Sequence, residues 1–150
     1  MNIQNSDCEK RIESKLEVST YVSRLKFALE NGGAQLVFQE ERLVDEGRDE
    51  KYTNRYTIAE LFPKQDPVEA LKDELKLIKV EEYIETVKDL RFQKRSEMRV
   101  FGRYYSANEV YIKIRVELMQ ASAAGVNNAV FVMSFHNSTI PFKNVIFPYK

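Results

Sequence analysis

The ten residues Glu109–Leu118, EVYIKIRVEL, alternate between apolar and polar side chains without interruption. The apolar positions are Val110, Ile112, Ile114, Val116 and Leu118, and the polar positions between them are Tyr111, Lys113, Arg115 and Glu117. Because successive side chains of a strand point to opposite faces of a sheet, this pattern predicts a strand with one buried face and one polar face.

Two neighbouring stretches extend this prediction to a sheet. Residues 98–105 precede the alternating strand and are joined to it by Ser106-Ala107-Asn108, which predicts a hairpin. After a link at 121–128 that is rich in Gly, Ala and Asn, the apolar run 129–136 is typical of a strand buried on both faces. We expect these segments to pair antiparallel in one sheet.

The first ninety residues predict mainly helices. Apolar residues recur near helical spacing from about residue 8 to 30, where Asn31-Gly32-Gly33 supplies a stop. Asp66-Pro67 is an N-cap followed by proline at the first helical position, and the apolar stripe after it predicts a helix over 67–78. A second, rotated stripe consists of Val80, Tyr83, Ile84, Val87 and Leu90. It predicts either a second helix or one helix that bends near 78–80.

Shorter features lie between the helices. Residues 35–39 predict a short strand, 40–51 an exposed acidic loop, and 57–61 at most one turn of helix. The resulting order predicts one α+β domain over 1–150, with a short flexible N-terminal tail, in which helices pack on one face of a small antiparallel sheet. The other face of the sheet is then free to bind a ligand.

The 150-residue chain has 43% hydrophobic and 31% charged residues, which suits a single core. It contains no run of about 18 apolar residues, and its first residues are polar where a signal peptide is apolar, so we expect a cytoplasmic protein without a membrane segment. A single cysteine, Cys8, excludes a disulfide framework within this chain, and with the single histidine, His136, it makes a zinc site improbable. We therefore expect neither a metal nor another cofactor.

Charge is divided unevenly along the chain. Residues 1–90 hold 14 basic and 20 acidic residues, a net charge of −6, whereas residues 91–150 hold 9 and 3, a net charge of +6. The basic residues of 91–116 are interleaved with aromatic ones, and they are Arg91, Lys94, Arg95, Arg99, Arg103, Lys113 and Arg115. A basic and aromatic surface of this kind suits phosphate or nucleic acid. The competing interpretation is that these charges are solvated strand faces that pair with the acidic half.

The chain has no signature of a P-loop, a Rossmann dinucleotide site, a hydrolase nucleophile elbow or a zinc protease. The remaining candidate site is distributed. Tyr111, Lys113 and Arg115 share the polar face of their strand, and His136 reaches the same face if the strand 129–136 pairs alongside. A phenol, an ammonium, guanidinium groups and an imidazole suit metal-free cleavage of a phosphodiester by the adjacent 2′-hydroxyl, which needs a base, an acid and positive charge.

Each of these residues also has a structural explanation. A single histidine at a strand end is often a satisfied or solvated structural residue, and Tyr111 suits a sheet edge. Lys113 and Arg115 keep a strand face soluble, and Arg103 is placed to pair with Glu109 across the hairpin. The residues alone therefore predict a small α+β domain with a basic aromatic face.

The last third of the chain also carries a family resemblance. Its strings occur in a fixed order: Arg99-Val100-Phe101-Gly102-Arg103, Glu109-Val110-Tyr111-Ile112-Lys113-Ile114, Val132-Met133-Ser134-Phe135-His136, Ile140-Pro141-Phe142 and Phe147-Pro148-Tyr149-Lys150. This ordered set resembles the toxins of the MqsR (motility quorum-sensing regulator) type. Residues 21–33, 54–61 and 82–90 fit the weaker upstream pattern of that family, so the resemblance extends over most of the chain and is specific for 98–150.

The resemblance implies a RelE/YoeB-like fold and an endoribonuclease that cleaves mRNA without a metal ion and is blocked by a cognate antitoxin. Tyr111 takes the position of the family's strand tyrosine, and His136 takes the position after Ser-Phe, where other members have lysine. We assign catalytic roles to His136, Tyr111, Lys113 and Arg103, and RNA binding to Lys94, Arg95, Arg99 and Arg115. The expected partners are mRNA and the antitoxin, with a second copy of the chain as a further candidate.

Two other functions fit the same residues. One is a non-catalytic RNA- or protein-binding module that keeps the fold and uses the basic face. The other is a phage or mobile-element protein in which the resemblance is confined to the fold, since a fold alone does not determine function. A small DNA-binding protein encoded beside this chain would favour the toxin over both.

Overall fold

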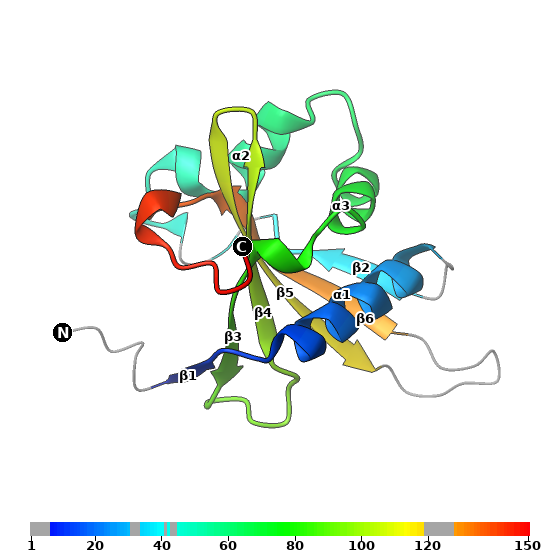
Figure 1. The fold of residues 1–150 in the computed structure, drawn as a ribbon. Coiled ribbons are helices and arrows are strands. Elements are labelled where there is room, and N and C mark those ends of the chain that lie inside the picture. The colour runs from blue at the N-terminus through cyan, green and yellow to red at the C-terminus, as the bar shows by residue number, and fades with distance from the viewer. Residues whose placement is uncertain (1–6, 31–33, 41, 43–44, 119–127) are drawn as a thin grey trace.

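The computed structural model describes residues 7–30, 34–40, 42, 45–118 and 128–150 (Figure 1). The helices are α1 (Lys15–Glu30), α2 (Asn54–Leu61) and α3 (Pro67–Leu75). The strands are β1 (Cys8–Arg11), β2 (Ala34–Phe38), β3 (Tyr83–Asp89), β4 (Met98–Tyr105), β5 (Asn108–Leu118) and β6 (Asn128–Asn137). Short 3₁₀ turns occupy Glu50–Tyr52, Val80–Glu82 and Phe142–Asn144. The predicted N-terminal tail, the stop at 31–33 and nearly all of the link 121–128 lie outside the described residues.

The described strands form one sheet in the order β1-β3-β4-β5-β6-β2. β4 and β5 are joined by the two-residue turn Ser106-Ala107, in which Ser106 has a positive φ of 56°. β5 pairs antiparallel with β6, as the two strongest strand patterns predicted. β2 pairs with β6 in parallel, so the sheet is mixed rather than wholly antiparallel. The five residues of β2 contain nothing that specifies the direction of its pairing.

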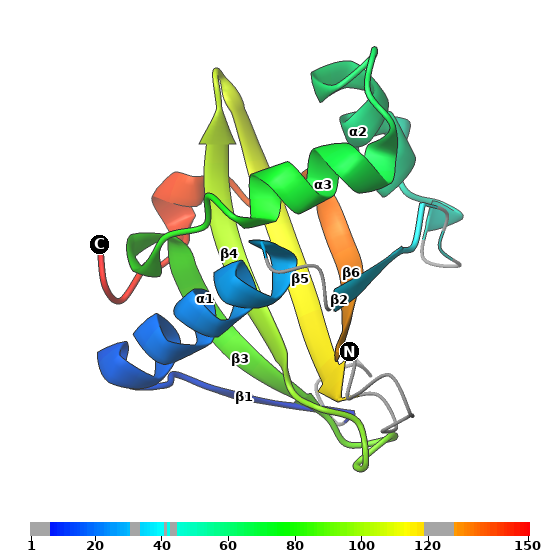
Figure 2. The same cartoon turned by 90° about the vertical axis from the view of Figure 1, so that its right-hand side faces the viewer.

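α1 and α3 cross one face of the sheet, which we call the helix face (Figure 2). Leu25 of α1 and Leu71 of α3 are at most 3% exposed. These helices pack against inward-facing side chains of the sheet that include Tyr83, Phe101, Ile112, Ile114 and Val132. This layer is the main core because most of the buried apolar side chains belong to it. Burial of one such side chain stabilises the fold by about 2 kcal/mol. The α+β class and the packing of the helix that begins at Pro67 are confirmed.

Residues 8–14 differ from the predicted helix. Cys8–Arg11 form β1, which pairs antiparallel with β3 and becomes an edge of the sheet. α1 begins only at Lys15, because Ser14 and Glu17 form a capping box. The amide of Glu17 donates to Ser14 Oγ at 3.1 Å, and the amide of Ser14 donates to Glu17 Oε1 at 3.0 Å. The sequence signal for this start is the pattern Ser-x-x-Glu, which the apolar spacing used for the prediction does not take into account.

Residues 83–89 form a strand where the apolar spacing predicted a helix. Tyr83 and Glu85 lie opposite consecutive residues of β4, so Ile84 is an extra residue in a bulge. A bulge shifts the alternation of side chains by one residue, which leaves Ile84 and Val87 of the predicted stripe on the same face three positions apart. That spacing imitates a helix, and the predicted second helix is wrong for this reason.

α2 is two turns long, where the sequence predicted at most one. Thr53 caps it by accepting a hydrogen bond from the amide of Tyr56 at 3.3 Å. The buried side chain of Asn54 donates to the carbonyl oxygens of Gln39 and Met133 at 2.6 and 3.1 Å. These two bonds tie the start of α2 to the end of β2 and to β6.

The face of the sheet opposite the helices, which we call the open face, is covered in part by the C-terminal segment (Figure 1). Phe142 and Phe147 pack over Gly102 of β4, where an added Cβ would lie 2.9 Å from both rings. A larger residue would therefore displace this segment. The part of the open face formed by β5 and β6 borders two cavities. Within the described segments, no helix is long and apolar enough to cross a membrane.

Candidate functional site

The open face brings together the polar side of β5 and the end of β6. Tyr111 lies directly opposite His136, and Lys113 lies opposite Ser134. Directly opposed residues of antiparallel strands share a face, so these four side chains form one cluster. The rings of Tyr111 and His136 stack, with centroids 5.4 Å apart and planes inclined by 24°. The predicted convergence of Tyr111, Lys113 and His136 is therefore confirmed.

A cavity of about 310 Å³ opens beside this cluster, and we call it the cationic pocket. Its charged and hydrogen-bonding lining includes Arg42, Arg48, Arg91, Lys113, Ser134 and His136, together with Asp7 and Asp89. Asp89 is paired with Arg91, whose Nε lies 3.2 Å from Oδ1 of the carboxylate. Among the described residues, no carboxylate lies within ion-pair distance of Arg42, Arg48 or Lys113. The pocket therefore has an excess of positive charge that suits an anion.

Arg42 is held in this pocket by its own loop and by β6. Its Nη1 donates to Oγ of Ser134 at 2.9 Å, and its backbone amide donates to Oδ2 of Asp45 at 3.0 Å. Burial, and then the charge of Arg48, lower the pKa of the Arg42 guanidinium. The group stays protonated, because arginine does not lose its proton in proteins. Arg42 is thus a fixed cation whose position depends on Ser134.

His136 is neutral at pH 7. Its side chain is 5% exposed, and burial lowers its pKa to about 4, with three neighbouring cations acting in the same direction. Nδ1 lies 2.9 Å from the carbonyl oxygen of Asn137, which accepts and cannot donate. We therefore assign the proton to Nδ1, which leaves the lone pair on Nε2. His136 is a proton acceptor at Nε2.

Burial also shifts the pKa values of the two neighbours of His136 on β5, in opposite directions. Burial, and next the charge of Glu85, raise the pKa of Tyr111 to about 12. Burial lowers the pKa of Lys113 below its usual value, and the charge of Arg42 adds to this effect. An ammonium of lowered pKa gives up its proton more readily than a solvated lysine does. The cluster therefore holds a proton acceptor at His136 and a proton donor at Lys113.

Arg115 lies on the open face as predicted, but other residues there neutralise it. Its Cζ lies 4.6 Å from the ring centroid of Phe131, and its Nε lies 3.4 Å from Oε1 of Glu117. The side chain is 11% exposed and does not line the cationic pocket. We assign Arg115 to the packing of β5 on β6 rather than to RNA binding.

Arg99 lies on the helix face, because it is opposite Ile114 in the hairpin. It makes a two-pronged ion pair with the buried carboxylate of Glu13, with Nη2 2.8 Å from Oε1 and Nε 3.1 Å from Oε2. Its Cζ also lies 4.5 Å from the ring centroid of Tyr21. A buried ion pair therefore takes the place of the predicted RNA contact.

Arg103 also lies on the helix face, opposite Val110. Its Nη1 donates to the carbonyl oxygen of Leu77 at 2.9 Å and lies 3.1 Å from Oε1 of Glu82. Glu109, its predicted cross-strand partner, instead accepts a hydrogen bond from a backbone amide of the C-terminal segment. The sheet separates Arg103 from His136, and we do not retain it among the catalytic residues.

Lys94 and Arg95 lie in the exposed loop between β3 and β4. Arg95 stacks on Phe92, with its Cζ 3.9 Å from the ring centroid. The loop enters β4 at the residue opposite Arg115, whereas His136 lies toward the other end of β5. Neither basic residue lines the cationic pocket, so they remain candidates only for contacts with a longer RNA.

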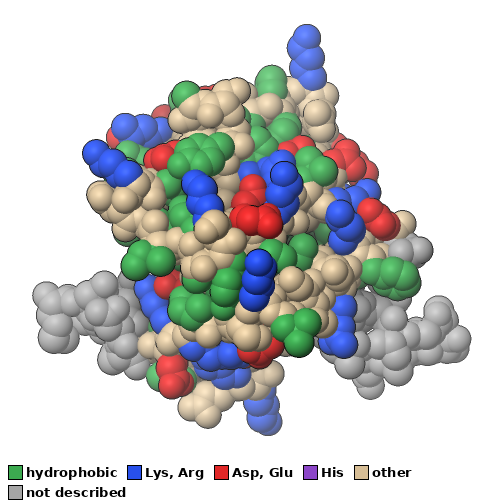
Figure 3. Space-filling view, viewed as in Figure 1, with side chains coloured by type: hydrophobic (Ala, Val, Ile, Leu, Met, Phe, Trp, Pro, Cys, Tyr) green, Lys and Arg blue, Asp and Glu red, His purple; other side chains and the backbone are tan. Residues whose placement is uncertain are grey.

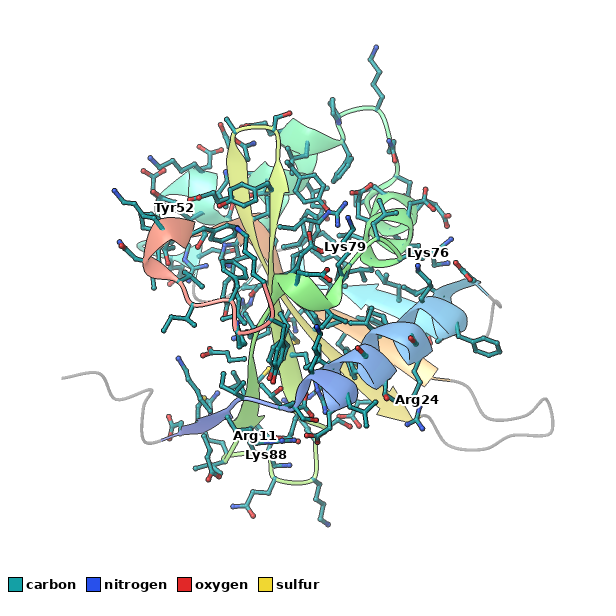
Figure 4. The ribbon with its side chains drawn as sticks, in the orientation of Figure 1. Arg11, Arg24, Tyr52, Lys76, Lys79 and Lys88 are labelled. Carbon is teal, nitrogen blue, oxygen red and sulfur yellow. The ribbon has the colours of Figure 1, made fainter. Side chains whose placement is uncertain are left out.

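Basic side chains elsewhere on the molecule lie among acidic ones. Figure 3 shows the two kinds intermingled over the side on which the C-terminus lies. Arg24 on α1 and Lys76 after α3 lie on the helix side, away from the open face (Figure 4). The interpretation that the basic residues of 91–116 pair with the acidic half therefore holds for Arg91, Arg99 and Arg103. It does not hold for Lys113, which has no carboxylate within ion-pair distance among the described residues.

Sequence reasoning missed Arg42, Arg48 and Ser134. The loop 40–51 is acidic and has no periodicity, so nothing in it indicates that two of its arginines turn toward the sheet. Ser134 is brought opposite Lys113 by a register shift between β5 and β6. The alternation of β5 predicts which of its own residues face the pocket but not where this shift occurs.

Among the described residues, no group of three or more His, Cys, Asp or Glu side chains is placed to hold a metal ion. Comparisons of the chain with models of protein families, with curated proteins and with solved structures found no significant match. Function is therefore inferred from the sequence strings and from the chemistry of the cationic pocket.

Proposed function

We propose that the chain is an endoribonuclease of the mRNA interferase type that acts without a metal ion, and that the cationic pocket is its active site. One juxtaposition carries the proposal. A neutral imidazole and a buried ammonium line the same pocket as two guanidinium groups that have no carboxylate partner among the described residues. Cleavage of RNA by the adjacent 2′-hydroxyl requires such a set of groups.

Arg42 and Arg48 hold the non-bridging oxygens of the phosphate in this proposal. Hydrogen bonds from a guanidinium to an anion are roughly twice as strong as neutral ones. Arg42 is already fixed by Ser134, so little reorganisation is needed when the charge on the phosphoryl oxygens increases. Donors arranged in this way contribute roughly 10²–10³-fold each to the rate.

His136 and Lys113 carry out the two proton transfers. Nε2 of His136 takes the proton of the 2′-hydroxyl while the 2′-oxygen attacks phosphorus. The bond from phosphorus to the 5′-oxygen breaks, and Lys113 gives that oxygen a proton. The products are a 2′,3′-cyclic phosphate and a 5′-hydroxyl end, and solvent then restores the two side chains. Tyr111 is a positioning residue that stacks on the imidazole.

A non-catalytic RNA-binding module is the second candidate, and one observation favours it. An imidazole with a pKa of about 4 is a weaker base than a solvated one, and the His136 side chain is 5% exposed. In this case the same pocket binds a phosphate and leaves it intact. Product analysis separates the two functions, because only the enzyme produces a cyclic phosphate.

The test is cleavage of an end-labelled RNA by the purified chain in excess chelator. We expect Lys113→Met and His136→Gln each to lower the rate by about 10²–10⁴-fold, the usual contribution of a group that transfers a proton. Arg24→Met, on the outer side of α1, is the matched control and keeps the wild-type rate. Thermal melting of each variant checks that it is folded.

Three results contradict the enzyme. They are equal rates for the wild type and both site variants, cleavage that requires added magnesium, and binding of RNA without cleavage. The last of these selects the RNA-binding module instead.

The antitoxin belongs to the same proposal. We expect expression of the chain alone to arrest growth and co-expression of a small DNA-binding protein encoded beside it to restore growth. His136→Gln removes the arrest if RNA cleavage causes it. Growth arrest that persists in this variant would separate toxicity from the cationic pocket.

A further inference from the structure

A second cavity, of about 610 Å³, lies on the open face next to the cationic pocket, and we call it the side pocket. Residues of β1, β3, β5 and the C-terminal segment form its walls. Its apolar lining includes Ile12, Ile84, Ile140, Phe142, Val145 and Ile146. Arg48 lines both cavities, so the two are neighbours.

The stacked pair Tyr111 and His136 contributes one ring to the lining of each cavity. Tyr111 lines the side pocket, and His136 lines the cationic pocket. Because the ring centroids are only 5.4 Å apart, the two cavities approach each other closely at this pair of rings. A ligand that places an anionic group on one side and a flat group on the other fits this arrangement. A nucleotide has this construction, and bases of single-stranded RNA bind to aromatic and apolar surfaces.

One ion pair supplies polar groups to the side pocket. Nζ of Lys10 lies 3.5 Å from Oε2 of Glu85, and both residues line the cavity. The carboxylate has further lone pairs for N–H donors, and the ammonium has further protons for an acceptor. The pair therefore matches a base edge that presents adjacent donors beside an acceptor.

Guanine is the base with such an edge. Its N1–H and N2–H donors are adjacent, and O6 lies beside them. Adenine and cytosine place their single amino donor next to an acceptor, and uracil has one N–H between two acceptors. A carboxylate consequently forms a two-pronged contact with guanine alone.

We propose that the side pocket is a guanine subsite that selects the nucleotide attached to the phosphate in the cationic pocket. Glu85 accepts from N1–H and N2–H of the base, and Lys10 donates to O6. The base lies against Tyr111 and the isoleucine side chains of the wall. The inference rests on the proposed function for its RNA ligand, but recognition of the base does not require that the phosphate is cleaved.

The experiment is a chemical-shift titration of the full chain with the 3′-monophosphates of guanosine, adenosine, cytidine and uridine, and with inorganic phosphate. A two-pronged contact to a base discriminates by about tenfold or more, so we expect guanosine 3′-monophosphate to bind at least about tenfold more tightly than the other three. Glu85→Gln is expected to remove this preference. Since the variant also loses a negative charge, which affects all four anions alike, the ratio of affinities is the quantity compared. Glu81→Gln, an exposed carboxylate before β3, is the matched control and keeps the ratio.

A second variant tests the wall of the pocket. Ile140 is 54% exposed, so Ile140→Glu places a charge in the side pocket without disturbing the core. We expect it to remove the binding of guanosine, used without phosphate, and to leave the binding of inorganic phosphate unchanged. Loss of both ligands in a folded variant would contradict a separate base site.

Failure of the subsite and failure of the proposed function have different signatures. Equal affinity for the four nucleotides, or a guanine preference that Glu85→Gln leaves intact, overturns the subsite. Neither result bears on RNA cleavage, which the assay of the proposed function measures independently. If the phosphate site is wrong instead, inorganic phosphate does not bind, but guanosine still binds to the wild type and not to Glu85→Gln.

Discussion

The helix face and the cationic pocket on the open face both hold buried guanidinium groups, but these groups have different partners. On the helix face, Arg99 pairs with Glu13 and Arg103 pairs with Glu82. On the open face, Arg42 donates to a hydroxyl group, and no carboxylate among the described residues lies within ion-pair distance of it. A guanidinium that already has a carboxylate is a structural group, whereas one without such a partner remains available to an anion. The partners of these cations, more than their number, therefore make the cationic pocket the candidate site for an anion.

Glu13 is the centre of the network on the helix face. Its side chain is 4% exposed, and it accepts hydrogen bonds from Thr86 at 2.8 Å and from Arg99. Burial acts to raise the pKa of Glu13, but the hydrogen bonds from Arg99 and Thr86 hold it below its usual value. The hydroxyl of Tyr149 donates to the carbonyl oxygen of Glu13, so the same network fastens the C-terminal segment.

The largest effect expected from this comparison concerns stability. Arg99→Met leaves the carboxylate of Glu13 buried without its main cation, and removal of one partner of a buried pair typically costs about 3–5 kcal/mol. Lys113→Met removes a charge that burial already disfavours, so we expect the free energy of unfolding to change by less than about 1 kcal/mol or to rise. Urea denaturation of the two variants beside the wild type measures both effects.

A double variant provides the control for this prediction. Glu13→Gln combined with Arg99→Met removes the unpaired charge, and we expect it to be more stable than Arg99→Met alone. Equal losses of stability for Arg99→Met and Lys113→Met would show that the two faces do not differ in the way proposed.

The next effect concerns pH, and it arises on the open face. The pKa of His136 is about 4 in the folded chain against 6.5 for a solvated histidine, so the unfolded chain binds more protons between these values. The stability that neutral His136 contributes is therefore complete above pH 6.5 and is lost as the pH falls toward 4. The loss is at most about 3 kcal/mol. Denaturation at pH 7 and near pH 4.5 measures it.

His136→Gln is the matched variant, because glutamine does not titrate. Between pH 7 and 4.5 its stability should fall less than that of the wild type, and the difference belongs to the imidazole. An NMR titration of the single histidine with a midpoint near 6.5 would contradict the burial described here.

Pairing across the hairpin makes part of the site predictable from the sequence. Given the turn at Ser106-Ala107, Arg103 must lie opposite Val110 and Arg99 opposite Ile114, both of which belong to the apolar set of β5. Both arginines can thus be assigned to the buried face once this two-residue turn is known. The longer link Ser106-Ala107-Asn108 that the sequence predicted shifts the register by one residue and would place both arginines on the polar face. The predicted RNA surface over 91–116 rests on the number of basic residues along the chain, whereas the hairpin divides these residues between the two faces of the sheet.

Other features depend on events that leave little trace in the sequence. The bulge at Ile84 makes a strand resemble a helix, and β1 has no apolar alternation because it is an exposed edge strand. Arg42 and Arg48 come from an irregular loop whose direction is set by bonds such as the one to Ser134. Periodicity reports which side of a regular element is buried, and an irregular loop has no periodicity to report.

The smallest expected effect is a change in the salt dependence of RNA binding, which should differ between variants of the open face and of the helix face. For single-stranded nucleic acid, the logarithm of the affinity falls with the logarithm of salt concentration by about 0.7 per phosphate contact. Arg42→Ala and Arg48→Ala should each weaken binding and reduce this slope by about 0.7, whereas Arg103→Ala, whose guanidinium is paired with Glu82, should leave the slope unchanged. The measurement is fluorescence anisotropy with an RNA whose 2′-hydroxyls are methylated, so that cleavage cannot interfere. A slope that only Arg103→Ala reduces would place the RNA on the helix face and reverse the comparison between the two faces.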